Sequence, residues 1–180
     1  FYSLCENGQD TIDKTQFKQA LFNAGLSSLD YRLKSLFEKL EKHGDQINFE
    51  EFKYFTRIGG LLAEKALRGE LAVPDFRDFS RNLDKIYDEV LPNRSGDLAR
   101  YIPPLAEVDP EQFGIAVVTT DGQIYQRGDT NVDFSIQSMC KPFNYSFAIE
   151  KLGLEKVNRH VGVEPSGRQF DDLTLMVKGM

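Results

Sequence analysis

Residues 113–143, FGIAVVTTDGQIYQRGDTNVDFSIQSMCKPF, decide how the second half of the chain folds. The stretch opens with apolar and small residues over 113–118, which is typical of a strand, and Asp121-Gly122 is a strong signal for a two-residue hairpin turn. Residues 138–152 then have a helical pattern, and Gly153 stands where a glycine commonly ends a helix. The sequence therefore predicts a strand, a tight turn, a return strand and a long helix, in that order.

Ser138 and Lys141 lie three residues apart at the predicted start of this helix. At 3.6 residues per turn the two side chains share one face, and a helix N-terminus favours the negative charge that develops on a reacting hydroxyl. A lysine removed from water loses its proton more easily and can then serve as a base. The pair therefore fits a serine nucleophile with a lysine base. Chance alone gives roughly 0.7 such pairs in this composition, so a capping serine beside a solvated lysine stays the alternative.

The first seventy residues contain a repeat. Ile12 and Phe17 recur as Ile47 and Phe52, 35 residues further along the chain. Apolar residues stand at helical spacing, and Asn48 followed by Glu51 is a capping-box pattern that predicts a helix start. A repeat of this length predicts two helix–loop–helix units packed face to face, and it resembles a pair of EF-hands.

The repeat lacks the carboxylates that an EF-hand loop uses to bind calcium. With Ile12 or Ile47 at the eighth loop position, the first, third, fifth and twelfth positions hold Cys5, Asn7, Gln9 and Gln16 in one loop and Leu40, Lys42, Gly44 and Glu51 in the other. We therefore expect no metal site here, and a helical scaffold or interaction module instead.

Composition and charge exclude several function classes. A net charge of −6 argues against broad binding to nucleic acid or to an anionic membrane surface, and no apolar run approaches the roughly 20 residues of a membrane-spanning helix. Two cysteines form no disulfide framework, and no signal peptide is visible, so we expect an intracellular protein of the mitochondrial matrix or cytoplasm. With a boundary near Pro74, we predict an α+β chain whose all-α EF-hand-like domain covers residues 1–73 and whose second domain covers residues 74–180.

Several longer motifs surround the Ser138–Lys141 pair. They are, in chain order, Tyr101-Ile102-Pro103-Pro104-Leu105-Ala106, Phe113 to Val118, Gly128-Asp129-Thr130, Phe134 to Phe143, and Glu164-Pro165-Ser166-Gly167. This ordered series resembles the serine-dependent glutaminase family, whose fold is similar to that of the β-lactamase and penicillin-binding group. The resemblance runs from about Tyr87 to Leu175. The degenerate EF-hand-like front also resembles the helical domain that precedes the catalytic domain in glutaminases of the animal type.

The resemblance implies a hydrolase that converts L-glutamine and water to L-glutamate and ammonia, without a cofactor or metal. Ser138 would be the nucleophile and Lys141 its base, while Tyr101 and Gln137, together with Ser138, would hold the glutamine. The alternatives from the residues alone are that Tyr101 is a packed ring and that Gln137 is a hydrogen-bonding loop residue. The family also implies a homo-oligomer, and it leaves open activation by an anion such as phosphate.

The chain departs from the family after Thr174. An Asn-Ala-Gly-Ala segment and further Asn, Glu and Tyr residues of the family are not present in it. We therefore expect residues 74–180 to be an incomplete catalytic domain with weak or no activity by itself. Two alternatives stay open: a non-catalytic interaction or assembly protein derived from a glutaminase, and a serine enzyme directed at lactams or peptides. The motifs that flank Ser138 disfavour the latter.

Overall fold

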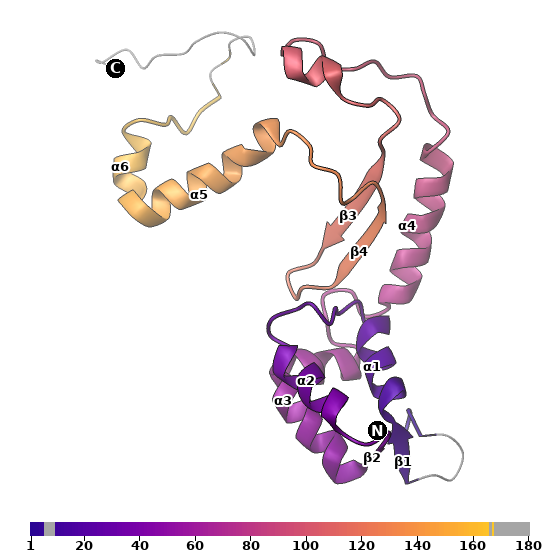
Figure 1. Cartoon of the computed structure of the whole chain (residues 1–180). Helices are drawn as coiled ribbons and strands as arrows, with labels where there is room; N and C mark the ends of the chain where they lie inside the picture. The colour runs from indigo at the N-terminus through magenta and orange to yellow at the C-terminus, as the bar shows by residue number, and fades with distance from the viewer. Residues whose placement is uncertain (6–9, 166, 168–180) are drawn as a thin grey trace. The chain divides into compact units, whose positions relative to one another are not determined.

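The computed structural model describes residues 1–5, 10–165 and 167. It divides into two compact units, Phe1–Val132 and Asp133–Met180. The first unit contains β1 (Thr11–Asp13), α1 (Lys14–Asn23), α2 (Lys34–Lys42), β2 (Gln46–Asn48), α3 (Phe49–Arg68), α4 (Phe76–Val90), η1 (Pro103–Glu107), β3 (Gly114–Val118) and β4 (Ile124–Gly128) (Figure 1). The second contains η2 (Gln137–Met139), α5 (Cys140–Leu152) and α6 (Leu154–Asn158). The predicted α+β class is confirmed, and the domain division at Pro74 stays a prediction.

The two repeats start their second helices in the same way. At α3, the Asn48 side chain accepts from the N–H of Glu51 at 3.0 Å, and the Glu51 carboxylate accepts from the N–H of Asn48 at 2.9 Å. At α1, Asp13 accepts from the N–H of Thr15 at 2.7 Å, and the Gln16 side chain accepts from the N–H of Asp13 at 2.9 Å. Each pair satisfies N–H groups that a helix start leaves without partners. The capping box predicted at Asn48 is confirmed, and the first repeat has its own.

The repeats are joined by the short antiparallel sheet of β1 and β2. Ile12 stands opposite Ile47 in this pairing, as the 35-residue repeat had aligned them, and both side chains are fully buried. The N–H of Lys14 extends the pairing by donating to the carbonyl of Asp45 at 2.8 Å. The second predicted helix–loop–helix unit is therefore present as α2, β2 and α3, and of the first unit the described residues show β1 and α1.

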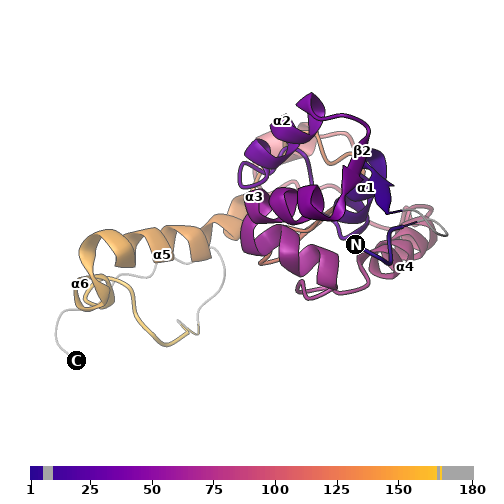
Figure 2. The ribbon, with the colours of Figure 1, turned by 90° about the horizontal axis from the view of Figure 1, so that it is seen from below.

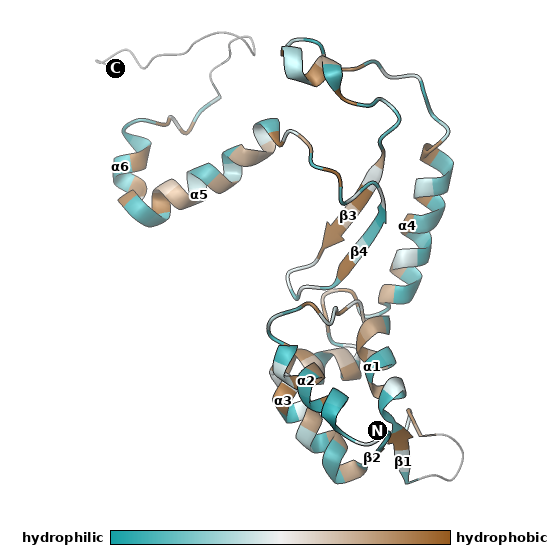
Figure 3. Ribbon diagram, in the orientation of Figure 1, coloured by the Kyte–Doolittle hydropathy of each residue, from teal (hydrophilic) through white to brown (hydrophobic). Residues whose placement is uncertain are grey.

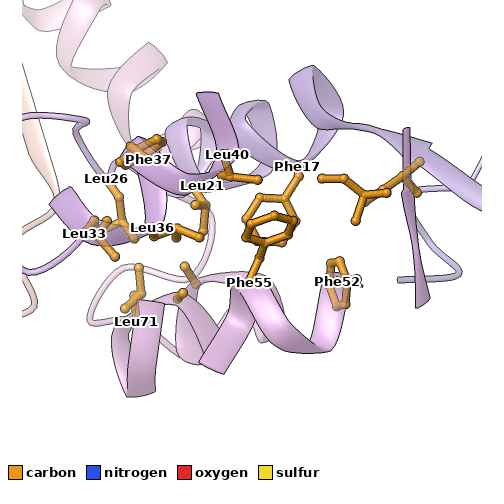
Figure 4. Packing of buried hydrophobic residues seen from close by; sticks show 14 residues of the cluster. Phe17, Leu21, Leu26, Leu33, Leu36, Phe37, Leu40, Phe52, Phe55 and Leu71 are labelled. Carbon is orange, nitrogen blue, oxygen red and sulfur yellow. The ribbon is translucent and has the colours of Figure 1, made fainter. Parts of the chain in front are cut away.

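A continuous apolar core fills the space between α1, α2 and α3. Phe17 and Phe55 are at its centre, and the Phe17 ring meets the Phe52 ring edge-on at 5.3 Å (Figure 4). Viewed from below, α2 and α3 lie side by side over this core (Figure 2). The apolar stripes predicted from helical spacing supply most of its members, which include Phe17, Leu21, Leu33, Leu36, Phe37, Leu40, Phe52, Phe55, Ala63 and Leu71.

Helix α3 bends at Gly60, whose φ of 61° and ψ of −157° are not helical. This backbone region is accessible almost exclusively to glycine. The preceding residue, Gly59, is buried, and a Cβ there would lie 2.4 Å from the Cβ of Ala63 and 2.9 Å from Leu36. The glycine pair thus provides the bend and the close approach of α3 to α2.

The predicted β-hairpin is confirmed, but its turn is longer than predicted. β3 and β4 are antiparallel with Val118 opposite Ile124. The N–H of Thr119 donates to the carbonyl of Gln123 at 3.0 Å, and the N–H of Gly122 donates to the carbonyl of Thr119 at 2.9 Å. Gly122 has a φ of 90°. Three residues, 120–122, therefore lie between Thr119 and Gln123, the last hydrogen-bonded pair, so the expected two-residue turn is wrong.

Helix α4 runs beside this hairpin and is attached to β4 by charged and polar contacts (Figure 1). Arg127 forms ion pairs with Asp84 at 3.0 Å and Asp88 at 2.6 Å. The hydroxyl of Tyr125 donates to the carboxylate of Asp84 at 2.9 Å. Burial of Tyr125, reinforced by the neighbouring Asp84 carboxylate, raises the pKa of its hydroxyl. Tyr125 therefore keeps its proton and remains a hydrogen-bond donor to α4.

The second unit consists of α5 and α6 after the short helix η2. The apolar positions of α5 are visible as brown segments in Figure 3. Phe143 and Phe147 are 64% and 61% exposed, whereas Val157 of α6 is 4% exposed. Within its described residues the unit thus buries little of its apolar surface. No helix in the described ranges combines the length and apolar character that crossing a membrane requires.

Candidate functional site

The turn that carries Ser138 begins with an uncommon backbone conformation at Gln137. Ile136 has helical angles, φ −69° and ψ −18°, and Gln137 follows with a φ of 40°. In the part of the chain that the structure describes, Gln137 is the only residue besides glycines with a positive φ. Such conformations cost about 1–3 kcal/mol in other residue types and cluster at functional sites. Backbone strain therefore accumulates directly before the candidate nucleophile.

Ser138 occupies the middle of η2, one short turn ahead of α5. The N–H of Met139 donates to the carbonyl of Ile136 at 2.9 Å, and the N–H of Cys140 donates to the carbonyl of Gln137. The α-helix begins at Cys140, so the predicted helical segment 138–152 starts with a tighter turn than expected. Ser138 consequently lies just before the positive end of the α5 macrodipole.

Lys141 lies in the first turn of α5, three residues after Ser138, as the sequence predicted. The side chains of Gln137, Ser138 and Lys141 are all exposed. The dry surroundings expected for a lysine base are therefore not found among the described residues. Helix α5 packs against η2 and α6, and this contact leaves the site face open.

Tyr101 belongs to the other compact unit, where it precedes η1 and is 59% exposed. Gln137, Ser138 and Lys141 thus lie close together at the start of α5 in the second unit, whereas Tyr101 lies in the first unit, residues 1–132. The interpretation of Tyr101 as a packed ring does not fit this exposure. Its role in holding a substrate stays a prediction.

Two other residues of this segment, Cys140 and Ser166, have nucleophilic side chains. Cys140 is a free thiol and half-buried, which fits a packing residue. Ser166, in the Glu164–Gly167 motif, lies outside the described residues.

The EF-hand-like loops use their polar residues for structure. The carboxylate of Glu51, which stands at the twelfth loop position, accepts from Asn48 and lies 3.2 Å from Nε2 of His43. The N–H of Asn48, followed by the His43 contact, holds the pKa of Glu51 below its ordinary value. Asn7 and Gln9 lie outside the described residues. Elsewhere in the described ranges, no three His, Cys, Asp or Glu side chains gather as a metal-binding group.

Two features at glutamine residues were not predicted from the sequence. Gln137 entered through the family resemblance, but its positive φ has no sequence signal, because glutamine is not typical of that conformation. Gln123 is fully buried although it stands in a turn, where a polar residue is normally exposed. The structure alone identifies both positions.

Comparisons with known proteins agree with this arrangement. Residues 96–179 match the glutaminase family model, and residues 1–74 match a model of the EF-hand domain. The mitochondrial liver isoform of glutaminase from Mus musculus is 32% identical over 186 residues, covering 100% of this chain and 31% of the mouse protein. A thermolabile glutaminase from Rhizobium etli is 46% identical over 97 residues, covering 53% of this chain and 31% of that protein.

Among solved structures, Mglu in its Tris and glutamate form is 42% identical with a TM-score of 0.47, covering 51% of this chain and 20% of that one. The chain therefore spans about a third of the length of the relatives named above. The matched segment includes all four candidate site residues, Tyr101, Gln137, Ser138 and Lys141. Residues 96–179 are thus similar to the glutaminase family, and in this chain they follow a segment that matches an EF-hand domain.

Proposed function

We propose that this chain contributes to the hydrolysis of L-glutamine to L-glutamate and ammonia, with Ser138 as the nucleophile and Lys141 as its base. The observation that carries the proposal is the glutaminase match over residues 96–179, which spans the strained turn at Gln137 and Ser138. The identity of 32% along the whole chain with the mouse relative, itself named a glutaminase, supports the same activity.

The chemistry follows from the residue types on the turn. The hydroxyl oxygen of Ser138 attacks the side-chain amide carbon of glutamine while Lys141 takes up the hydroxyl proton. The C–N bond then breaks, and Lys141 returns the proton to the leaving ammonia. Water attacks the resulting acyl ester, which releases glutamate and restores the Ser138 hydroxyl. Backbone N–H groups near Ser138 would stabilise the negative oxygen of each tetrahedral intermediate.

Gln137 and Tyr101 are assigned to substrate binding in this proposal. Gln137 adjoins the nucleophile, and its side-chain amide can both donate and accept hydrogen bonds to the polar ends of a glutamine molecule. Tyr101 offers an exposed ring and hydroxyl, which suit a ligand that is part apolar and part polar. Both residues lie within the segment that matches the family.

Lys141 is exposed, so the proposed role as a base requires that the site become buried. A lysine base works best in surroundings that disfavour its charged form. The mouse relative is about three times as long as the matched region. We propose that segments corresponding to the rest of that protein cover the turn and supply the missing burial.

The decisive experiment places this chain in the mouse glutaminase in exchange for its matching third and measures ammonia release from glutamine. In this chimera Ser138→Ala should lower the rate by about 10³-fold or more, because the acyl-enzyme cannot form. Lys141→Arg should be about as inactive, since arginine stays protonated and cannot accept the hydroxyl proton. Ser135→Ala, an exposed serine three residues before the nucleophile, is the matched control and should keep the activity.

An active chimera that tolerates Ser138→Ala would refute the assignment of the nucleophile. A chimera in which Lys141→Arg retains full activity would refute the lysine base while leaving Ser138 in place. The 180-residue chain assayed by itself reports how much activity this segment has without those covering segments.

The proposal extends to the partners and location. Exposed apolar residues on α5, among them Phe143 and Phe147, favour assembly, so we propose that the protein forms a homo-oligomer, which sedimentation velocity would measure. The same surface suits the alternative of a non-catalytic assembly protein. That alternative predicts that the protein forms oligomers and that Ser138→Ala does not change the rate of ammonia release.

The name of the mouse relative supports an intracellular site in the mitochondrial matrix, with the cytoplasm as the alternative. Activation by phosphate is tested by adding that ion to the chimera assay.

A further inference from the structure

The turn between β3 and β4, residues 119–123, is anchored to the EF-hand domain by hydrogen bonds that neither the family match nor the proposed chemistry explains. Gln123 is at its centre, with 0% of its side chain exposed. It is the only buried polar side chain among the described residues. A buried amide costs free energy unless its hydrogen-bonding groups are satisfied, so its partners decide what it does.

Every polar group of the Gln123 side chain has a partner. The amide nitrogen donates to the carbonyl of Ala24 and to the carbonyl of Val73, each at 2.8 Å. The amide oxygen accepts from the N–H of Val73 at 2.9 Å and from the hydroxyl of Thr119 at 3.3 Å. Two donors and two acceptor positions are the full capacity of a glutamine amide. One side chain thus connects the hairpin, the end of α1 and the segment before α4.

The carbonyls at the end of α1 explain why donors are needed here. Ala24 is the C-cap residue of α1, and the next residue, Gly25, has a φ of 84°. Carbonyl groups at a helix C-terminus have no partners inside the helix and carry the negative end of its dipole. The carbonyl of Ala24 accepts from Gln123, and the carbonyl of Gly25 accepts from the N–H of Ile124 at 2.9 Å. The hairpin therefore caps α1 from outside the helix.

Two further contacts fix the other side of the turn. Arg32 donates from Nη2 to the carbonyl of Asp121 at 2.6 Å, and the Asp121 carboxylate accepts from the N–H of Ala72 at 2.7 Å. Asp30 pairs with Arg32 at 2.6 Å, and this hydrogen bond holds the pKa of the Asp30 carboxyl below its usual value. A Cβ at Gly122 would lie 2.2 Å from Nη2 of Arg32 and would displace the end of that side chain, and the φ of 90° also favours glycine.

We propose that residues 119–123 are a docking element and that the EF-hand domain and its following segment are its receptor, formed by Ala24, Gly25, Arg32, Ala72 and Val73. The EF-hand domain of this chain then acts as an intramolecular scaffold that fixes the first hairpin of the glutaminase segment. Gln123 is the positioning residue of this contact. The inference is independent of the chemistry assigned to Ser138 and survives if that chemistry fails.

The nature of the receptor makes Gln123 hard to replace. A leucine of similar size would leave the Ala24 carbonyl and the N–H and carbonyl of Val73 without these partners. A glutamate would lose both donors and would bury a charge beside two carbonyl oxygens. Both substitutions should therefore release the turn, whereas a substitution at exposed Gln126 on the same hairpin removes no hydrogen bond made by a described side chain.

The test is amide hydrogen exchange measured by NMR on the 180-residue chain. In the unchanged protein, the Nε2 protons of Gln123 should be protected from exchange, because both are hydrogen-bonded and buried. In Gln123→Ala, the backbone amides of Val73 and Ile124 should exchange at least about tenfold faster, since a lost buried hydrogen bond of this kind corresponds to about that factor. Gln126→Ala should leave these rates unchanged. Equal rates in Gln123→Ala and Gln126→Ala would overturn the proposal.

A second variant covers the case in which Gln123→Ala unfolds the whole unit. Arg32→Ala removes only the contact to the Asp121 carbonyl and the ion pair with Asp30, both partly exposed. It should accelerate exchange of the Gly122 and Ile124 amides by a few fold and leave the Phe55 amide in the core of the EF-hand domain unaffected. Uniform acceleration over the whole unit, or none at Gly122 and Ile124, would count against a docking contact at this turn.

Discussion

The EF-hand domain and the Ser138 segment differ in how much of their apolar surface they bury. Phe17, Leu21 and Leu36 are completely buried in the first, whereas Phe143 and Phe147 of the second are largely exposed. Both segments contain aromatic residues at helical spacing, so the difference does not lie in their local patterns. The two segments differ in whether a second surface is present that covers their apolar side chains. The 35-residue repeat provides such a surface within the first seventy residues, because α1 of the first repeat packs against α3 of the second and β1 pairs with β2.

The difference shows which part of this chain carries its own stability. A fold made by repetition completes its core through neighbouring segments, so it depends little on the remainder of the protein. The mouse relative is about three times as long as this chain, and the Ser138 turn lies in the segment that matches the glutaminase family model. Its helices present apolar faces of the kind that a larger domain covers. The chemistry proposed for Ser138 and the stability of the chain thus belong to different parts of the molecule.

Phe17→Ala should produce the largest effect, a loss of about 3–5 kcal/mol in the free energy of unfolding. The ring has no exposed surface and packs against Phe52 and Phe55, so its removal leaves a cavity in the centre of the core. Urea denaturation followed by circular dichroism measures the change.

The matched variant is Phe147→Ala on α5, which removes the same ring from a 61% exposed position. It should change the unfolding free energy by no more than about 0.5 kcal/mol. If the two variants lost similar free energy, the Ser138 segment would have a buried core of its own and the contrast between the two regions would be wrong.

Much of the EF-hand domain could be predicted because its determinants are local or repeated. The spacing of Leu33, Leu36, Phe37 and Leu40 predicted a helix, and the structure buries all four residues. Asn48 and Glu51 predicted the start of α3 through a pattern that spans only three residues. The alignment of Ile12 with Ile47 anticipated that they face each other in the β1–β2 sheet.

Features that depend on distant parts of the chain could not be predicted in this way. Gln123 stands in a turn, and its burial depends on Ala24, which is 99 residues away in the sequence. The tight turn at Asp121-Gly122 was recognised, but its length was not, because the longer form is fixed by the same distant contacts. Residues 138–152 were predicted to form one helix, but the structure places Ser138 in η2 and begins α5 at Cys140.

Gly60→Ala should have a smaller effect, a destabilisation of about 1–3 kcal/mol, through the backbone alone. A Cβ at Gly60 meets no atom within 4 Å, so packing is not the cause. The cost comes from the combination of φ 61° and ψ −157°, which alanine rarely adopts. Urea denaturation measures the loss.

Gly44→Ala is the control, because that glycine also has open space around it but no positive φ. It should be neutral or stabilise by about 0.4–1 kcal/mol, through a smaller entropy of the unfolded chain. A Gly60→Ala variant as stable as Gly44→Ala would mean that α3 straightens without loss, and the bend would then not be a requirement of the EF-hand core.

The smallest expected effect is a difference between the two repeats in how their stability depends on pH. Glu51 caps α3 as a carboxylate, whereas Gln16 fills the same position of α1 as a neutral amide. Because the folded pKa of Glu51 lies below its ordinary value, its contribution to stability is present above that value and is lost as the pH falls through the lower folded pKa. Glu51→Gln keeps an acceptor for the N–H of Asn48 and removes the titration.

Between about pH 7 and about pH 3, the urea midpoint of Glu51→Gln should therefore fall less than that of the unchanged chain. The pKa of Asp13 is also lowered, mainly by the hydroxyl of Thr15, so Asp13 should cause part of the fall in urea midpoint that remains in Glu51→Gln. Asp13→Asn measures this contribution of the first repeat. An identical acid dependence in Glu51→Gln and the unchanged chain would show that the carboxylate of Glu51 acts only as a hydrogen-bond acceptor. Glu51 and Gln16 would then not differ in how their capping contribution depends on pH, although only one of them can ionise.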